Sequence, residues 1–213
     1  MKIIYRLFFL LISNSCFSQE YTDMWEMYKS SHDFLKYKSC YLADFSIKQN
    51  FQNTIFYKIS STDPKAESMA KQESIWGIYL ASDSLLFLNT RRMGMRNKNL
   101  KNAYIKVREI GKYCHFIGEY VPSIIEKDKI MRNDIQGSIG GALGAAWLNT
   151  IIDSKGDLPY IMNLEIGVPH LLDQYYLAFI LRDYPDLAEQ FKSEPTPDEL
   201  ETQLKYVRLL NKF

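Results

Sequence analysis

Residues 103–118 read AYIKVREIGKYCHFIG, and this stretch decides the fold. Apolar and polar residues alternate over 103–110, which is the period of a β-strand with one buried face. Gly111-Lys112 then marks a turn, and the apolar run over 113–118 is typical of a returning strand. The stretch predicts an antiparallel hairpin inside a sheet.

Other strands are expected on both sides of this hairpin. Residues 40–45 and 54–59 are rich in aromatic and β-branched residues, whereas 60–73 is polar and reads as a loop with a turn at Asp63-Pro64. Residues 19–38 read as a short helix or a loosely packed lead-in. Two more hairpins are indicated by apolar runs around short turns. These are 75–80 and 85–88 around Ser82-Asp83-Ser84, and 160–165 and 168–172 around Ile166-Gly167.

Residues 173–213 predict helices. Asp173 can cap a first helix, Tyr184-Pro185 interrupts it, and 186–192 forms a second. Thr196-Pro197-Asp198-Glu199 combines an N-cap residue, a proline at the first helical position and a glutamate that can bond back to the cap. The helix that follows places four apolar residues on one face, namely Leu200, Leu204, Val207 and Leu210.

The expected class is therefore α+β, with an antiparallel meander of five to seven strands, a glycine-rich helix against it and C-terminal helices. We expect three parts: a signal peptide over 1–18, an α+β domain over 19–172 and a helical segment over 173–213. The chain is 46% hydrophobic and 14% aromatic, which is ample for one core.

The first 18 residues have the three parts of a secretory signal. Lys2 and Arg6 are followed by the apolar run 7–12 and a short polar stretch that ends at Ser18. The apolar run is far shorter than the roughly 20 residues of a membrane anchor. The sequence predicts export to the periplasm or the medium. A lipoprotein anchored through Cys16 is the less favoured alternative, because a serine stands three positions earlier, where leucine is usual.

Removal of residues 1–18 would leave 24 basic and 25 acidic residues, a net charge of −1. A chain with this balance has no excess of positive charge to bind phosphate groups, so nucleic acid is not an expected partner. Two cysteines would remain, Cys40 and Cys114. In an oxidising compartment they can form a disulfide, and the alternative is two separate buried thiols.

The segment from Gly137 to Leu148 is rich in small residues. On a helix, its glycines Gly137, Gly140, Gly141 and Gly144 would form a flat face for packing or interaction. The uninterrupted apolar stretch has ten residues and would span about 15 Å as a helix, half of a bilayer core. A stable transmembrane span is therefore not expected. A buried or partner-facing helix is favoured over a glycine loop.

No motif identifies a cofactor, a metal ion or a catalytic residue. His32, His115 and His170 lack metal-ligand spacing, and each is expected to be a single histidine with satisfied hydrogen bonds. Cys114 and His115 are neighbours on a strand and must point to opposite faces. They therefore cannot act as a thiol–imidazole pair.

Several segments together resemble an uncharacterised family, a domain of unknown function in small exported proteins of Bacteroidetes-type bacteria. The segments are Trp76-Gly77, Gly111 to Phe116, Gly137 to Ala146, Asp183 to Leu187, and Leu210 to Lys212. The resemblance covers most of the chain after the signal. It implies no activity and no catalytic residues.

These observations favour a non-enzymatic binding or envelope accessory protein, with another envelope protein or a second copy of the chain as its partner. One alternative is a hydrolase whose site is dispersed in the sequence. A pocket with clustered titratable groups would favour this enzyme, whereas a shallow surface would favour binding. Another alternative is membrane association through 137–148.

Overall fold

The computed structural model describes the chain from Met24 onward, with several gaps. The described residues are 24–50, 55–72, 74–95, 103–119, 121, 123–124, 128 and 157–213. Within them the chain forms ten strands and five α-helices, so the α+β class is confirmed. The predicted signal peptide and the glycine-rich segment lie outside the described residues.

All strands belong to one sheet, and the strand pairs are antiparallel. The strands are β1 (Trp25–Tyr28), β2 (Tyr41–Ala43), β3 (Ser46–Gln49), β4 (Phe56–Ser60), β5 (Gly77–Leu80), β6 (Leu85–Asn89), β7 (Ala103–Glu109), β8 (Tyr113–Gly118), β9 (Leu158–Asn163) and β10 (Pro169–Leu171). The helices are α2 (Ser31–Leu35), α3 (Pro64–Lys71), α6 (Gln174–Ile180), α7 (Pro185–Lys192) and α8 (Leu200–Leu210), and a 3-10 turn, η1 (Leu181–Asp183), follows α6.

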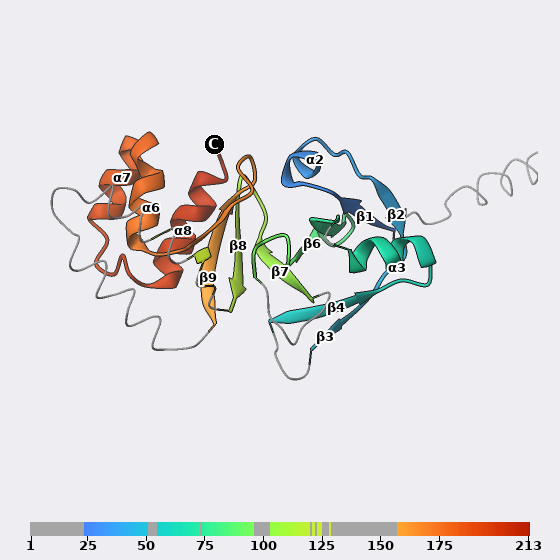
Figure 1. The fold of residues 1–213 in the computed structure, drawn as a ribbon. Helices are drawn as coiled ribbons and strands as arrows, with labels where there is room; N and C mark the ends of the chain where they lie inside the picture. The colour runs from blue at the N-terminus through green and yellow to red at the C-terminus, as the bar shows by residue number, and fades with distance from the viewer. Residues whose placement is uncertain are drawn as a thin grey trace, which may run out of the picture.

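Strand β7 is the junction of the sheet. The main order is β10-β9-β8-β7-β6-β5-β1-β2, and β4 also pairs with β7 while carrying β3 on its other side. Residues 103–105 of β7 pair with β4, whereas Val107 and Glu109 pair with β8. Since β6 occupies the other side of β7, β4 and β8 follow one another along a single side. The sheet therefore forks at the middle of β7 (Figure 1).

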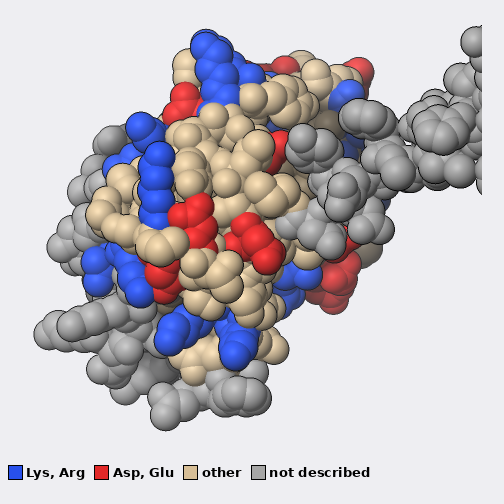
Figure 2. Space-filling view, turned by 90° about the vertical axis from the view of Figure 1, so that its right-hand side faces the viewer, with Lys and Arg blue, Asp and Glu red and all other residues tan. Residues whose placement is uncertain are grey.

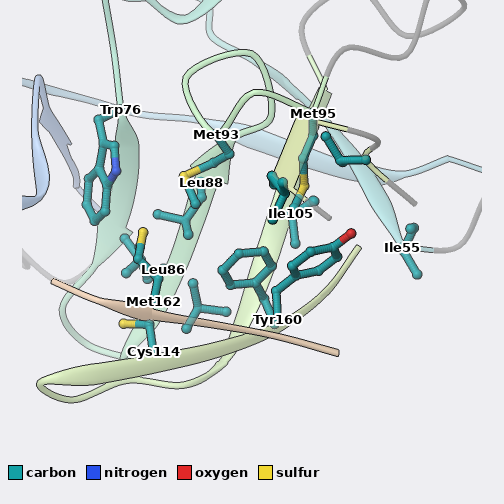
Figure 3. Packing of buried hydrophobic residues seen from close by; sticks show 14 of the residues in the cluster. Ile55, Trp76, Leu86, Leu88, Met93, Met95, Ile105, Cys114, Tyr160 and Met162 are labelled. Atoms are coloured by element: carbon teal, nitrogen blue, oxygen red, sulfur yellow. The ribbon is translucent and has the colours of Figure 1, made fainter. Parts of the chain in front are cut away.

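One face of the sheet is covered by a single large cluster of buried side chains. Leu88 of β6, Ile105 of β7, Cys114 of β8 and Tyr160 of β9 all belong to it. Figure 3 shows these side chains gathered over four neighbouring strands. The alternation predicted over 103–110 is confirmed up to the bulge, because Ala103, Ile105 and Val107 of β7 enter this cluster.

The opposite face carries two separate clusters. In the first, Phe87 and Tyr104 pack against Ala66 and Ala70 of α3. In the second, residues of β8 and β9 pack against α6, α7 and α8, which stand over that end of the sheet in Figure 1. Burial of the α8 residues Leu204, Val207 and Leu210 contributes roughly 1.5 to 3 kcal/mol each. The C-terminal helices therefore pack directly on the sheet.

Three hairpins predicted from local sequence are confirmed: β5–β6, β7–β8 and β9–β10. The predicted strands over 40–45 and 54–59 correspond to β2 and β4. The expected number of strands was too low, because β1 and β3 were not predicted. Residues 19–38 contain β1 as well as the short helix α2, so the reading of this region was incomplete.

The loop expected over 60–73 is wrong, because most of it is helix α3. Asp63 is the N-cap, and its carboxylate accepts hydrogen bonds from the backbone N–H groups of Lys65 and Ala66. Pro64 occupies the first helical position, where its missing N–H costs nothing. Asp63-Pro64 is therefore the start of a helix and not a turn.

Helix α8 begins three residues later than predicted. Its first residue is Leu200 and its N-cap is Glu199, whose side chain makes no capping hydrogen bond. Residues 197–199 form a turn in which the N–H of Glu199 donates to the carbonyl of Thr196. The buried amide of Gln203 donates to the carbonyls of Pro197 and Asp198, so a side chain from inside the helix holds this turn.

Candidate functional site

A pocket of about 230 Å³ lies beside the fork of β7. It is lined by residues of β3, β4, β7 and β8 and of the segments next to them. These residues are Gln49, Ile55, Tyr57, Lys106, Arg108, Ile117 and Asp157. The pocket therefore exists because β4 and β8 separate after sharing one side of β7.

Lys106 and Arg108 dominate the charge of this pocket. They stand two residues apart on β7, so both project from the face opposite the main cluster. The pairing shifts between Val107 and Glu109, which makes Arg108 the extra residue of a β-bulge. In the described part of the chain, neither cation forms a salt bridge. The bulge thus places a guanidinium at the fork with its hydrogen-bonding groups uncommitted.

The remaining lining residues suit recognition more than reaction. Gln49 supplies an amide, Tyr57 an aromatic ring that packs edge-on against Phe87 at 5.1 Å, and Asp157 a carboxylate at the rim. The described residues that line the pocket include no serine, cysteine or histidine that could serve as a nucleophile. It can hold an anionic group by charge-assisted hydrogen bonds.

A second group of polar residues lies at the edge strand β10. His170 Nδ1 is 2.7 Å from Asp128 Oδ1, and Asp128 Oδ2 accepts a hydrogen bond of 2.8 Å from the backbone N–H of Leu171. The Asp128 side chain is 1% exposed and that of His170 is 18% exposed. The imidazole stacks on the ring of Tyr176 at 4.4 Å. Burial and the nearby carboxylate raise the pKa of Tyr176 above its ordinary value.

His115 of β8 lies in a different environment from His170. Its side chain is fully buried, and both ring nitrogens lack a hydrogen-bond partner among the described residues. Burial, aided by Arg108 and Arg208, lowers the pKa of His115 to about 4. The prediction that each histidine is satisfied is therefore wrong for His115. His32 is exposed on α2, and His170 has the Asp128 partner that its sequence neighbours did not reveal.

The structure does not bring the two candidate disulfide cysteines together. Both are free thiols: Cys114 is buried in the main cluster, and Cys40 packs at the edge of the cluster under α3. Burial raises the pKa of the Cys114 thiol to about 12 and also raises that of Cys40. Cys114 and His115 point to opposite faces, as predicted.

The other predicted interaction residues, Gly137, Gly140, Gly141 and Gly144, lie outside the described residues, so their packing role stays a prediction. None of the helices in the described ranges combines the length and apolar character of a bilayer span. Across the same ranges, His, Cys, Asp and Glu side chains do not gather in threes that could hold a metal ion. Figure 2 shows basic and acidic side chains interspersed on the face that carries β2 and α3.

Sequence reasoning missed both polar groups. The alternation over 103–110 already placed Lys106 and Arg108 on one face, and this is the signal that could have indicated the pocket. Asp128 and His170 are 42 residues apart, and no local pattern connects them.

The fold and these sites define a mixed α+β protein with a forked antiparallel sheet, four of its described helices on one face, and two separate polar sites. A family model matches residues 26–213, so the chain belongs to the family of unknown function DUF6563. This confirms the resemblance to an uncharacterised family. No curated protein and no solved structure matches the chain.

Proposed function

We propose that this protein is exported and acts outside the cytoplasm by binding, with the pocket at the fork of β7 as its binding site. The single observation that supports the proposal is the pair of cations that line the pocket, Lys106 and Arg108, neither of which forms a salt bridge with another described residue. The signal-like residues 1–18 support the compartment.

The pocket favours one acidic group of a larger partner over a complete small ligand. Its volume of about 230 Å³ lies below the roughly 300 to 1,000 Å³ of sites that enclose small molecules. An aspartate or glutamate side chain fits this volume, and arginine can bind its carboxylate through two hydrogen bonds. The partner is accordingly another envelope protein, or a second copy of this chain, that presents a carboxylate.

The residues of this pocket give no support to the alternative that the protein is a hydrolase. The described lining residues of the pocket include one carboxylate, that of Asp157, but no serine, cysteine or histidine to pair with it as a nucleophile. Any catalytic role depends on different residues, Asp128 and His170, which lie on the edge strand β10.

A fragment titration tests the binding proposal. ¹⁵N-labelled protein is titrated with acetyl-glutamate amide, and the uncharged acetyl-glutamine amide serves as the control ligand. We expect the glutamate probe to shift the amide signals of Lys106 and Arg108 with a dissociation constant of roughly 1 mM, which corresponds to about −4 kcal/mol. Arg108→Gln should weaken this binding at least about tenfold, since it removes the bidentate donor.

Lys58→Gln is the matched control variant. Lys58 is exposed on β4 next to Tyr57, and successive strand residues point to opposite faces. The Lys58→Gln substitution therefore removes one positive charge outside the pocket and should leave the affinity for the glutamate probe unchanged. Equal shifts with both probes, or equal losses in Arg108→Gln and Lys58→Gln, would contradict the proposal.

A further inference from the structure

The edge of β10 holds a histidine whose two ring nitrogens have different surroundings. Nδ1 lies 2.7 Å from the Asp128 carboxylate, which is almost fully buried. Nε2 makes no hydrogen bond within the described part of the chain, and the side chain keeps 18% of its surface exposed. One nitrogen is thus held by a carboxylate while the other is open.

Two further contacts fix the orientation of this pair. Asp128 is itself oriented by the backbone N–H of Leu171, 2.8 Å from its second oxygen. The imidazole plane is held against the ring of Tyr176 at 4.4 Å and an interplanar angle of 20°. A carboxylate at Nδ1 favours the tautomer with its proton on Nδ1, which leaves the lone pair of Nε2 free to accept a proton.

We infer that Asp128 and His170 form a general-base pair that activates water at the edge of β10 for hydrolysis of an acyl ester. This activity goes beyond the proposed binding function and uses none of the pocket residues. In this proposal His170 is the catalytic residue, because its Nε2 is the atom that would accept the proton of the water, and Asp128 is a positioning residue.

The step balances with water as the only co-reactant. Nε2 takes one proton from water as the water oxygen forms a bond to the acyl carbon. The bond between that carbon and the alcohol oxygen then breaks, and the departing alcohol takes the proton back from Nε2. The products are a carboxylic acid and an alcohol, and His170 returns to its starting state.

Hydrolysis of p-nitrophenyl acetate by the purified protein tests the inference. We expect His170→Gln to lower the second-order rate constant by about 100-fold or more, because general-base catalysis contributes roughly 100- to 10,000-fold. His32→Gln is the matched control, since it removes an exposed imidazole elsewhere. It should change the rate by less than about twofold. Equal losses in the two variants, or no loss in His170→Gln, would overturn the inference.

The Asp128→Asn variant tests whether Asp128 positions the imidazole of His170 or only stabilises the fold. The amide keeps an oxygen for the N–H of Leu171 but loses the negative charge beside Nδ1. We expect a lower hydrolysis rate together with a changed tautomer of His170 in ¹H–¹⁵N spectra. A lower rate with an unchanged tautomer would remove Asp128 from the mechanism.

The wild-type protein offers a measurement that needs no variant. Long-range ¹H–¹⁵N correlation at pH 7.5 should show His170 protonated on Nδ1 and bare on Nε2. Any other proton arrangement would overturn the general-base role, whether or not a variant folds. The fragment titration of the β7 pocket does not depend on this result, so the two proposals can fail separately.

Discussion

His115 and His170 lie in the same row of the sheet but in opposite environments. His115 of β8 stands opposite Ile161 of β9, and Ile161 stands opposite His170 of β10. Residues opposite one another in antiparallel strands share a face, so both histidines are on the side of the C-terminal helices. Among the described residues His115 is buried without a hydrogen-bond partner, whereas His170 is at the edge with a carboxylate.

This comparison shows that a position within the sheet does not by itself determine the chemistry of a side chain. Toward the middle of the row, the helices remove water and the described residues supply no acceptor for His115, so burial favours its neutral form. At the edge, Asp128 supplies the acceptor and leaves the other ring nitrogen open. The partner, more than the fold, separates a packed histidine from a reactive one.

The largest expected effect is acid destabilisation through His115. Its pKa is lowered to about 4 in the folded state, from 6.5 for the ordinary side chain. Between these values the unfolded chain binds the extra proton, so stability is complete above pH 6.5 and is lost as pH falls toward 4. The loss is about 3 kcal/mol. Urea unfolding of the wild type and of His115→Leu, at pH 7.5 and pH 4, measures the difference between their losses.

Other groups also titrate in this range, so the wild-type curve alone is not diagnostic. His115→Leu removes only the imidazole and keeps an apolar side chain under the helices. Its free energy of unfolding should therefore fall with acid by about 3 kcal/mol less than that of the wild type. Identical pH dependence of the two proteins would show that His115 is not desolvated.

Asp128→Ala should make His170 resemble His115. The change leaves the Leu171 N–H and His170 Nδ1 without their acceptor, and unsatisfied buried groups cost about 1 to 3 kcal/mol each. Because His170 is partly exposed, we expect a total loss of about 2 to 3 kcal/mol. Urea unfolding at pH 7.5 measures it, and a loss below about 0.5 kcal/mol would mean that the pair contributes nothing to the edge of the sheet.

Gly111→Ala should loosen the helix that covers His115. A Cβ atom on Gly111 would lie 2.3 to 2.6 Å from the side chain of Asn211, just after α8. The Asn211 side chain cannot move away without losing two hydrogen bonds, because Oδ1 accepts from the Tyr113 N–H at 2.7 Å and Nδ2 donates to the Tyr113 carbonyl at 2.9 Å. We expect a loss of about 1 to 2 kcal/mol and a rise in the pKa of His115 as water enters.

A double-mutant cycle is the control for this clash. Asn211→Ala removes the atoms that the new Cβ would meet, so the two substitutions together should cost less than the sum of their separate effects. If the two losses of unfolding free energy are additive, Gly111→Ala acts on the turn at residues 111–112 and not through a clash with Asn211.

The smallest effect is expected from Arg208→Gln. Arg208 donates to Glu109 at 2.6 and 2.9 Å, but the Arg208 side chain is 51% exposed and that of Glu109 is 27% exposed, and ion pairs near the surface contribute less than about 1 kcal/mol. The readout is therefore the pKa of His115, which should rise slightly because a positive charge is removed from its surroundings. An NMR titration that shows a lower pKa would contradict this prediction.

Most of the meander was predictable because hairpins depend on local sequence. The turns at 82–84, 111–112 and 166–167 separate runs with clear strand patterns, and all three hairpins form. Helix α3 was missed because Asp63-Pro64 signals both a turn and a helix start. Strand β1 lies in a stretch that was read as helix or lead-in, and β3 is the mostly polar sequence Ser-Ile-Lys-Gln, which has no apolar run to mark a strand.

The sites were less predictable because they depend on non-local pairing. No local pattern tells that β4 and β8 share one side of β7, yet this sharing creates the pocket. The pairing of Asp128 with His170, and the covering of His115 by helices that begin some 60 residues later, are likewise products of the tertiary fold. Export and the packing of the glycine-rich segment stay predictions from sequence.

An NMR titration of His115 tests the account most directly, because burial without a partner distinguishes it from His170. The ring carbon shifts of His115 should keep their neutral values at pH 5.5 and change only near pH 4, where its pKa lies. A midpoint at the ordinary value of 6.5 would show that the imidazole has water or an acceptor beside it, and the contrast between the two histidines would then be wrong.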